Sequence, residues 1–375
     1  MKGRLTLATA LLAALSGCAE EVREPGTFFG DGCILDMGAA PCDDCIEFAH
    51  VTSLGSDELG PGYLVDRGTM ENVVRDGQGN YWVGQNEEIK VFDPDGAFVR
   101  TVGRRGDGPM EFGRAAPMHV DSAGRVHVFD PLNLRISVIG PDWTLAEEKK
   151  LPTWVSAEAP VDDGDRYVVQ ASIEEPGSEG MPLQIIDGTG VLKSFGSGDD
   201  PSPESPESLV PDLQESLVPV LHLAVGPEGS VFAARMAEYV IEAWSREGVR
   251  LGALRGEPQL NADNSIPSPD DPPPNFIGDI HVDRGGLLWV SLHILRPDHV
   301  LLDPSGDVSS ERPPDFYIRI YQVRLDVIDL TTCTLVASHL HDQPLILLDD
   351  RTVLGYGFTE LGSNTLDVLR MRLTR

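Results

Sequence analysis

The chain has 375 residues, with 60 acidic side chains against 29 lysines and arginines and a formal charge of −31. This length exceeds that of one ordinary domain, but repeat folds reach it as a single unit. Hydrophobic residues make up 41% of the chain, which is enough for a core and excludes global disorder. The negative charge argues against nucleic acid and against anionic lipid as an electrostatic partner, because both would be repelled.

The N-terminus has the features of an export signal. Lys2 and Arg4 precede an apolar run over residues 5–15, which is too short to cross a bilayer as a helix. The segment Leu15-Ser16-Gly17-Cys18 resembles a bacterial lipobox. The resemblance implies a signal peptide over residues 1–17, cleavage before Cys18 and acylation of that cysteine. We therefore expect a lipoprotein of the bacterial cell envelope, held in the outer membrane by its lipid anchor alone.

Four cysteines follow the lipidated one, namely Cys33, Cys42, Cys45 and Cys333. An even number in an exported chain predicts two disulfides, and four cysteines allow three pairings. The spacing of Cys42 and Cys45 is also that of a redox pair or of half a zinc site. Residues 18–47 are interpreted as an acylated tether and cysteine-containing segment.

Turns recur between short apolar strands along the remaining sequence. Each is followed by an aromatic or β-branched segment, such as Tyr81-Trp82-Val83, and a second turn often comes two strands later. The first turns lie at residues 76–79, 121–124, 162–164, 226–229, 283–286 and 349–350. This rhythm is typical of a four-stranded antiparallel unit, and no segment has a helical apolar period. Six units predict an all-β fold, a six-bladed β-propeller over residues 48–375.

The last unit is one strand short. It has three strands within residues 345–373, and the apolar segment 48–54 precedes the first complete unit without a partner. We expect this N-terminal strand to complete the last blade and close the ring.

One unit carries a more specific pattern. Residues 103–112 read GRRGDGPMEF and lead to Asp130, Asn133 and Arg135. This pattern resembles the NHL repeat, with Met110 in place of a usual glycine, and the whole chain resembles exported six-bladed propellers of the NHL-like class. Asn133 and Arg135 are expected to fix the turn between the second and third strands. NHL-like propellers include binders and enzymes, so the resemblance leaves the function open.

The longest connections are predicted to lie on one face. If the strands of each blade are called a to d from the centre outward, the a–b and c–d turns share one rim. The b–c and d–a connections share the other, and this second rim collects the insertions 173–182, 199–216, 257–275 and 296–317. Insertions gathered on one side of a repeat fold commonly mark a binding face. Cys333 falls in a c–d turn on the opposite rim, so we expect it to bond Cys33, Cys42 or Cys45 and clamp the N-terminal segment beneath the ring.

The innermost strands supply a set of candidate ligands at the central mouth. Alignment on the turns places Asn72, His222 and Asp279 at equivalent positions, with His119 and His281 two residues further on in their strands. Oxygen and nitrogen donors of this kind suit Ca²⁺ or Zn²⁺. Lactonase-like propellers hold a central metal, so a resemblance to them implies a metal-dependent hydrolase or lyase.

The preferred interpretation is nevertheless a non-catalytic binding module. Sequence motifs for a nucleophile elbow, a zinc protease or a phosphate-binding loop are missing from the chain. We expect no cofactor, and a protein, peptide or glycan ligand engaged through the long-loop face. The metal-dependent hydrolase or lyase remains the alternative.

Overall fold

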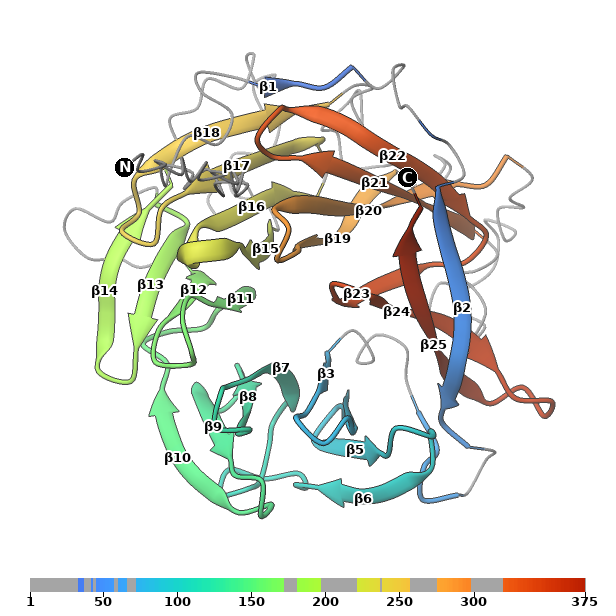
Figure 1. The fold of residues 1–375 in the computed structure, drawn as a ribbon. Coiled ribbons are helices and arrows are strands. Elements are labelled where there is room, and N and C mark those ends of the chain that lie inside the picture. The colour runs from blue at the N-terminus through green and yellow to red at the C-terminus, as the bar shows by residue number, and fades with distance from the viewer. Residues whose placement is uncertain are drawn as a thin grey trace, which may run out of the picture.

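The computed structural model shows six blades arranged in a ring around a central axis (Figure 1). It describes residues 33–36, 42, 45–56, 60–65, 72–171, 181–196, 221–236, 238–256, 275–297 and 320–374. Each blade is built on four antiparallel strands, and the prediction of a six-bladed all-β propeller is confirmed. A single turn of 3-10 helix, at Pro227–Gly229, accompanies these strands.

The first three blades take their strands in chain order. Blade 1 contains β3 (Val73–Arg75), β4 (Tyr81–Gln85), β5 (Glu88–Phe92) and β6 (Phe98–Val102). Blade 2 contains β7 (Ala116–Val120), β8 (Val126–Asp130), β9 (Arg135–Ile139) and β10 (Leu145–Lys150). Blade 3 contains β11 (Ala157–Pro160), β12 (Tyr167–Gln170), β13 (Leu183–Asp187) and β14 (Gly190–Phe195).

The other three blades include two strands from the N-terminal segment. Blade 4 contains β15 (Leu221–Val225), β16 (Val231–Arg235), β17 (Val240–Trp244), β18 (Arg250–Arg255) and the outermost β1 (Cys33–Ile34). Blade 5 contains β19 (Phe276–Val282), β20 (Leu287–Leu295), β21 (Tyr321–Asp329) and β22 (Thr334–His341). Blade 6 contains β23 (Leu345–Asp349), β24 (Thr352–Phe358), β25 (Asn364–Leu373) and β2 (Ile46–Leu54).

The recurrent turns form because an aspartate binds the backbone that follows it. In blade 1, Asp76 Oδ1 accepts the N–H groups of Gln78 and Asn80, each at 2.9 Å. Its Oδ2 accepts the indole N–H of Trp82 at 3.0 Å, which ties the turn to the neighbouring strand. Asp283 repeats the indole bond in blade 5. Side-chain bonds of this type stabilise tight turns, which is why the turn spacing predicted the blades.

The ring is closed by strands from the two ends of the chain. Strand β2 pairs antiparallel with β25, from Ile46 opposite Leu373 to Leu54 opposite Leu366. The two strands lie side by side at the edge of blade 6 (Figure 1). The expected completion of the last blade by the N-terminal strand is therefore confirmed. Closure removes a sheet edge that would otherwise be open to pairing with other chains.

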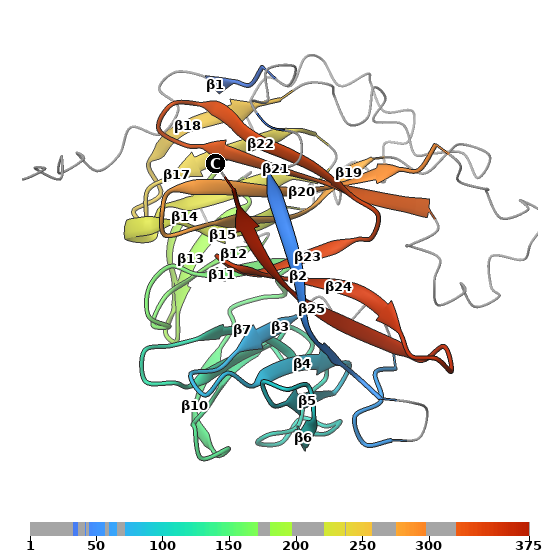
Figure 2. The same cartoon turned by 45° about the vertical axis from the view of Figure 1, so that its right-hand side comes forward.

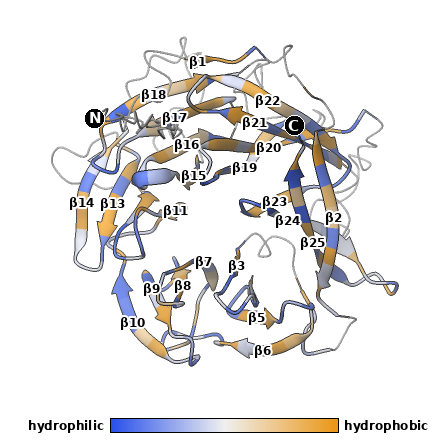
Figure 3. Ribbon diagram, in the orientation of Figure 1, coloured by the Kyte–Doolittle hydropathy of each residue, from blue (hydrophilic) through white to orange (hydrophobic). Residues whose placement is uncertain are grey.

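Apolar side chains fill the spaces between neighbouring blades. One cluster joins blades 1 and 2 through Trp82, Val126 and Phe112, each at most 2% exposed. Hydrophobic stretches recur along the strands all round the ring (Figure 3). Removing such side chains from water is the main favourable term in folding, so each blade depends on both neighbours for its core.

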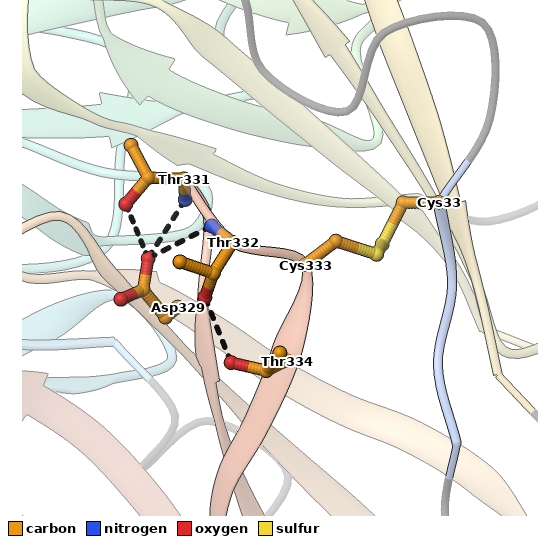
Figure 4. Close-up of a disulfide and its surroundings, with 6 residues drawn as sticks. All are labelled: Cys33, Asp329, Thr331, Thr332, Cys333 and Thr334. Carbon is orange, nitrogen blue, oxygen red and sulfur yellow. Dashed lines mark hydrogen bonds between the residues drawn. A yellow bond between two sulfur atoms is a disulfide. The ribbon is translucent and has the colours of Figure 1, made fainter.

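The segment ahead of β2 is fastened to the outside of the ring. Strand β1 pairs in parallel with β18, with Cys33 opposite Leu254, and makes blade 4 five-stranded. Cys33 forms a disulfide with Cys333 in the c–d turn of blade 5 (Figure 4). Cys42 forms a second disulfide with Cys45. The expected bond from Cys333 to an N-terminal cysteine is confirmed.

The position of this segment differs from the one expected. It lies along the outer edge of blade 4 and not beneath the ring, as the side view also shows (Figure 2). The reason is that β18 offers unpaired backbone groups at the blade's edge, and two residues of β1 suffice to use them. Cys18, the predicted lipidation site, and the predicted signal peptide over residues 1–17 lie outside the described residues. Within the described ranges, no helix is long and apolar enough to cross a membrane.

Candidate functional site

The strand order assigns the connections to two rims. We call the side with the a–b and c–d turns the turn rim and the side with the b–c and d–a connections the connection rim. Four b–c or d–a connections begin after Ala171, Gly196, Gly256 and Pro297, and they therefore belong to the connection rim. The predicted insertions fall almost wholly at 172–180, 197–220, 257–274 and 298–319, which lie outside the described residues.

Exposed apolar side chains gather on the connection rim. Leu132 is 64% exposed, Trp154 is 58% exposed and Leu361 is 76% exposed, and all three lie in b–c or d–a connections. The same rim carries Val65, Leu134 and Phe358, which are also exposed. Among the described residues of the turn rim, Val249 is the exposed large apolar side chain that lies in a turn. The other exposed large apolar residues lie on strands β1, β2, β6, β14 and β22. Exposed apolar side chains that are more numerous at one rim than at the other are the pattern expected of an interaction face.

The connection between blades 1 and 2 is a rigid loop over residues 103–112. Phe112 N–H donates to the Arg104 carbonyl at 2.7 Å, and Gly106 N–H donates back to the Phe112 carbonyl at 3.2 Å. The Phe112 ring is fully buried in the core between the two blades. Met110 has φ 58°, in the left-handed region that glycine favours, which accounts for the glycine usual at this place in the repeat pattern.

Two side chains of blade 2 donate hydrogen bonds to the backbone of this loop. Asn133 donates to the Gly106 carbonyl at 2.9 Å and also to Asp130 at 2.7 Å. Arg135 donates to the carbonyls of Asp107 at 3.1 Å, Gly108 at 2.9 Å and Glu111 at 2.5 Å. Asn133 and Arg135 were expected to fix the b–c turn. The asparagine does so through Asp130, but both residues also clamp the preceding d–a loop.

The predicted ligands of the central mouth are engaged in several separate bonds. Asp279 Oδ2 accepts the backbone N–H of Leu347 at 2.9 Å, which links blade 5 to blade 6. His281 Nε2 lies 2.9 Å from Asp350 Oδ1, in a second link between the same blades. The Asn72 carbonyl accepts the N–H of Gly84 at 2.9 Å, within blade 1. Among the residues with described positions, no group of three or more His, Cys, Asp or Glu side chains is arranged to hold a metal ion.

Two of the predicted histidines are half-buried and are neutral at physiological pH. His119 Nε2 and His222 Nε2 are shielded from water and have no hydrogen-bond partner. Burial lowers the pKa of each side chain to about 4, because it disfavours the charged imidazolium. For His119 the positive charge of nearby His127, whose ring centroid is 5.4 Å away, adds to the effect. A neutral imidazole nitrogen can accept a proton or a hydrogen bond, and neither of these two nitrogens is engaged in one.

The sequence analysis missed Glu158 on the innermost strand β11. Glu158 precedes the a–b turn of its blade, which begins at Asp162, by four residues. His222 and Asp279 precede the a–b turns of their blades by the same distance, so the three positions are equivalent. Burial raises the pKa of Glu158 to about 7, against the opposing charge of Arg114. A carboxyl group that titrates near neutral pH is suited to general acid–base chemistry. The turn alignment alone indicated this position, but a glutamate between two alanines gives no sign of burial.

No family model matches the chain, and no curated protein matches it in sequence. A Bacteroides fragilis protein whose name describes it as exported superposes with a TM-score of 0.53 at 13% identity, over 92% of this chain and 99% of that chain. A member of the DUF4221 family from Bacteroides vulgatus superposes with a TM-score of 0.56 at 8% identity, over 88% of this chain and 99% of that chain. At such low identities these likenesses show the shared propeller fold and nothing more specific.

Proposed function

We propose that this chain is an exported, lipid-anchored propeller of the NHL-like class that binds a protein, peptide or glycan through its connection rim. The observation that carries the proposal is the gathering of exposed apolar side chains on that rim, with Trp154, Leu132 and Leu361 as the most prominent. Aromatic and apolar anchors on a rigid scaffold are the usual source of binding energy at interfaces. The lipid on Cys18 would keep the ring at the envelope, and mass spectrometry of the mature N-terminus tests that part.

Site-specific photocrosslinking in the native envelope tests the binding rim. A photoreactive amino acid is placed at Leu132, Trp154 or Leu361 on the connection rim, and at Val249 on the turn rim as the matched control. We expect discrete adducts from the first three positions and none from the control. Equal adducts from both rims, or none from the connection rim, would count against the proposal.

A second candidate is a hydrolase or lyase at the central mouth. It is favoured by Glu158, whose pKa of about 7 suits proton transfer, and by the neutral His222 on the neighbouring innermost strand β15. The Ca²⁺ or Zn²⁺ of a lactonase-like site would need donors gathered at one point. Asp279 and His281 do not fit that role, because each is bonded to blade 6.

Turnover and metal content distinguish this candidate. A panel of lactones and esters is screened with the purified mature protein and with the variants Glu158→Gln and His222→Gln. Hydrolysis that both variants abolish, while their thermal unfolding is unchanged, would establish the enzyme. Stoichiometric metal that His222→Gln releases would establish a metal site.

A further inference from the structure

A continuous surface over blade 2 combines apolar and cationic side chains. We define the blade 2 platform as Arg104, Arg105, Leu132, Leu134 and Trp154. All five lie in the b–c or d–a connections that flank blade 2, and therefore on the connection rim. The side chains of Arg104 and Arg105 are 79% and 87% exposed, and the three apolar residues are exposed as well.

Contacts between the three connections bring these residues onto neighbouring segments of the rim. A Cβ on Gly113, just beyond the rigid loop, would meet the Leu132 side chain at 2.7 Å, so the b–c turn abuts the loop. The Leu134 carbonyl accepts the N–H of Leu151 at 2.8 Å, which joins the same turn to the segment that carries Trp154.

The platform is preorganised by buried bonds. Arg135 is 7% exposed, and its guanidinium binds carbonyls of the loop that presents Arg104 and Arg105. Asp130, which is fully buried, accepts the N–H groups of Gly113 and Arg114 at 3.1 and 2.9 Å. A ligand that meets a loop already fixed in place loses less conformational entropy on binding.

The charges of the platform favour an acidic ligand. Two adjacent exposed arginines stand out in a chain with a formal charge of −31. Arg104 pairs with Glu111 at 2.6 Å and Arg105 with Glu87 at 3.9 Å, but ion pairs this exposed contribute little stability. Glu111 also accepts the N–H of Gly108 at 3.0 Å, so it keeps a partner when Arg104 turns to another carboxylate. Arginine binds carboxylates with two parallel hydrogen bonds, which makes the exchange favourable.

We propose that the blade 2 platform is a docking site for a protein segment in which carboxylates alternate with apolar side chains. Its carboxylates would bind Arg104 and Arg105, while its apolar residues would cover Leu132, Leu134 and Trp154. The net negative charge of the chain disfavours such a segment in general, and the two arginines of the platform offer it local positive charge. This inference rests on the proposed function and names the partner chemistry for one part of the same rim.

Fluorescence anisotropy with three short labelled peptides tests the proposal on the mature protein. The first peptide contains glutamate and leucine, the second replaces glutamate by lysine, and the third replaces leucine by serine. We expect saturable binding of the glutamate–leucine peptide and at least about tenfold weaker binding of the other two, as for loss of one or more contacts worth about 1.4 kcal/mol. Equal or tighter binding of the lysine peptide, or no binding of the glutamate–leucine peptide, would overturn the proposal.

Charge-reversal variants locate the binding. Arg104→Glu with Arg105→Glu is compared with Arg246→Glu combined with Arg284→Glu, two exposed arginines on the turn rim. Both double variants change the net charge equally, so only local contacts distinguish them. We expect about tenfold weaker binding in the first and less than a twofold change in the second. Equal weakening in both would mean non-specific attraction and refute the site.

The two proposals can fail separately. If photocrosslinking at Leu132 and Trp154 gives adducts but neither peptide nor charge reversal has the expected effect, the rim binds a partner of other chemistry. If the glutamate–leucine peptide binds and Arg104→Glu with Arg105→Glu weakens it, the platform stands whatever the envelope partner is.

Discussion

The disulfide between Cys33 and Cys333 is expected to be the largest single covalent contribution to the stability of the ring. It joins residues that are 300 positions apart in sequence. A cross-link restricts the unfolded chain, and the loss of loop-closure entropy for a loop of this length corresponds to about 6 kcal/mol in the chain-entropy model. The disulfide between Cys42 and Cys45 spans only 3 positions, and the same relation gives about 2 kcal/mol.

The test compares Cys33→Ala/Cys333→Ala with Cys42→Ala/Cys45→Ala. Alanine suits the buried position of Cys33, and at Cys333 it keeps the backbone cost unchanged, since the residue has φ 53° in either case. Strand β2 still pairs with β25 in both variants, so the ring can still close. Urea unfolding under non-reducing conditions measures the free energy of unfolding and its dependence on denaturant.

We expect the first variant to lose several kcal/mol more than the second. Its m-value should also rise, because an unfolded chain without the long cross-link exposes more surface. An equal loss in both variants, or a loss below about 1 kcal/mol in the first, would refute the entropic reasoning.

Three further changes test the loop clamp, its glycine and the buried carboxyl. Arg135→Lys should lower the free energy of unfolding by about 1–3 kcal/mol in thermal melts, since lysine cannot reach three carbonyls at once; an unchanged melting temperature would contradict the clamp. Gly103→Ala should destabilise by more than about 1 kcal/mol, because a Cβ there would collide with the Phe112 ring and φ is +81°. The part of the stability that Glu158 contributes should fall as pH rises from about 4.5 to 7, because the folded state holds its proton up to a pKa of about 7 and the unfolded state does not, whereas the lowered pKa values of His119 and His222 make their contribution rise over the same range. Glu158→Gln should remove that part of the pH dependence in urea titrations. An unaltered profile would show that Glu158 does not have the raised pKa.

The architecture could be predicted because its signals are local. The bonds of Asp76 and Asp283 depend on residues only a few positions away, so turn spacing appears directly in the sequence. The pairing of β2 with β25 was also predictable. The sequence pattern has one strand without a partner near its start and one blade that lacks a strand at its end, so the first can complete the second. Strand β1 was not, because two residues carry no period, and β18 is separated from them by more than 200 positions.

The candidate site was harder to predict, because its properties arise from packing between blades. His281 aligns with the innermost strand as expected, but its partner Asp350 comes from the next blade. Burial shifts the pKa of Glu158, and its strand β11 packs against the innermost strands of both neighbouring blades. Arg135 has a recognisable place in the repeat pattern, yet the carbonyls that it binds belong to a loop 24 to 28 residues earlier. These residues can be recognised in the sequence, but the contacts between them form only when the blades pack against one another in the closed ring.

The fastening of the N-terminal segment also determines how the protein bears mechanical load. Tension applied upstream of Cys33 reaches the covalent bond to Cys333 first and passes into the c–d turn of blade 5. That turn is braced by Asp329, which accepts the N–H groups of Thr331 and Thr332 at 2.8 and 3.2 Å (Figure 4). The β2–β25 pair lies downstream of this bond along the chain. A pull on the chain upstream of Cys33 therefore acts on this covalent bond before it acts on the strand that closes the ring, whereas in a reduced protein the pairing of β1 with β18 and then that of β2 with β25 would resist the same pull.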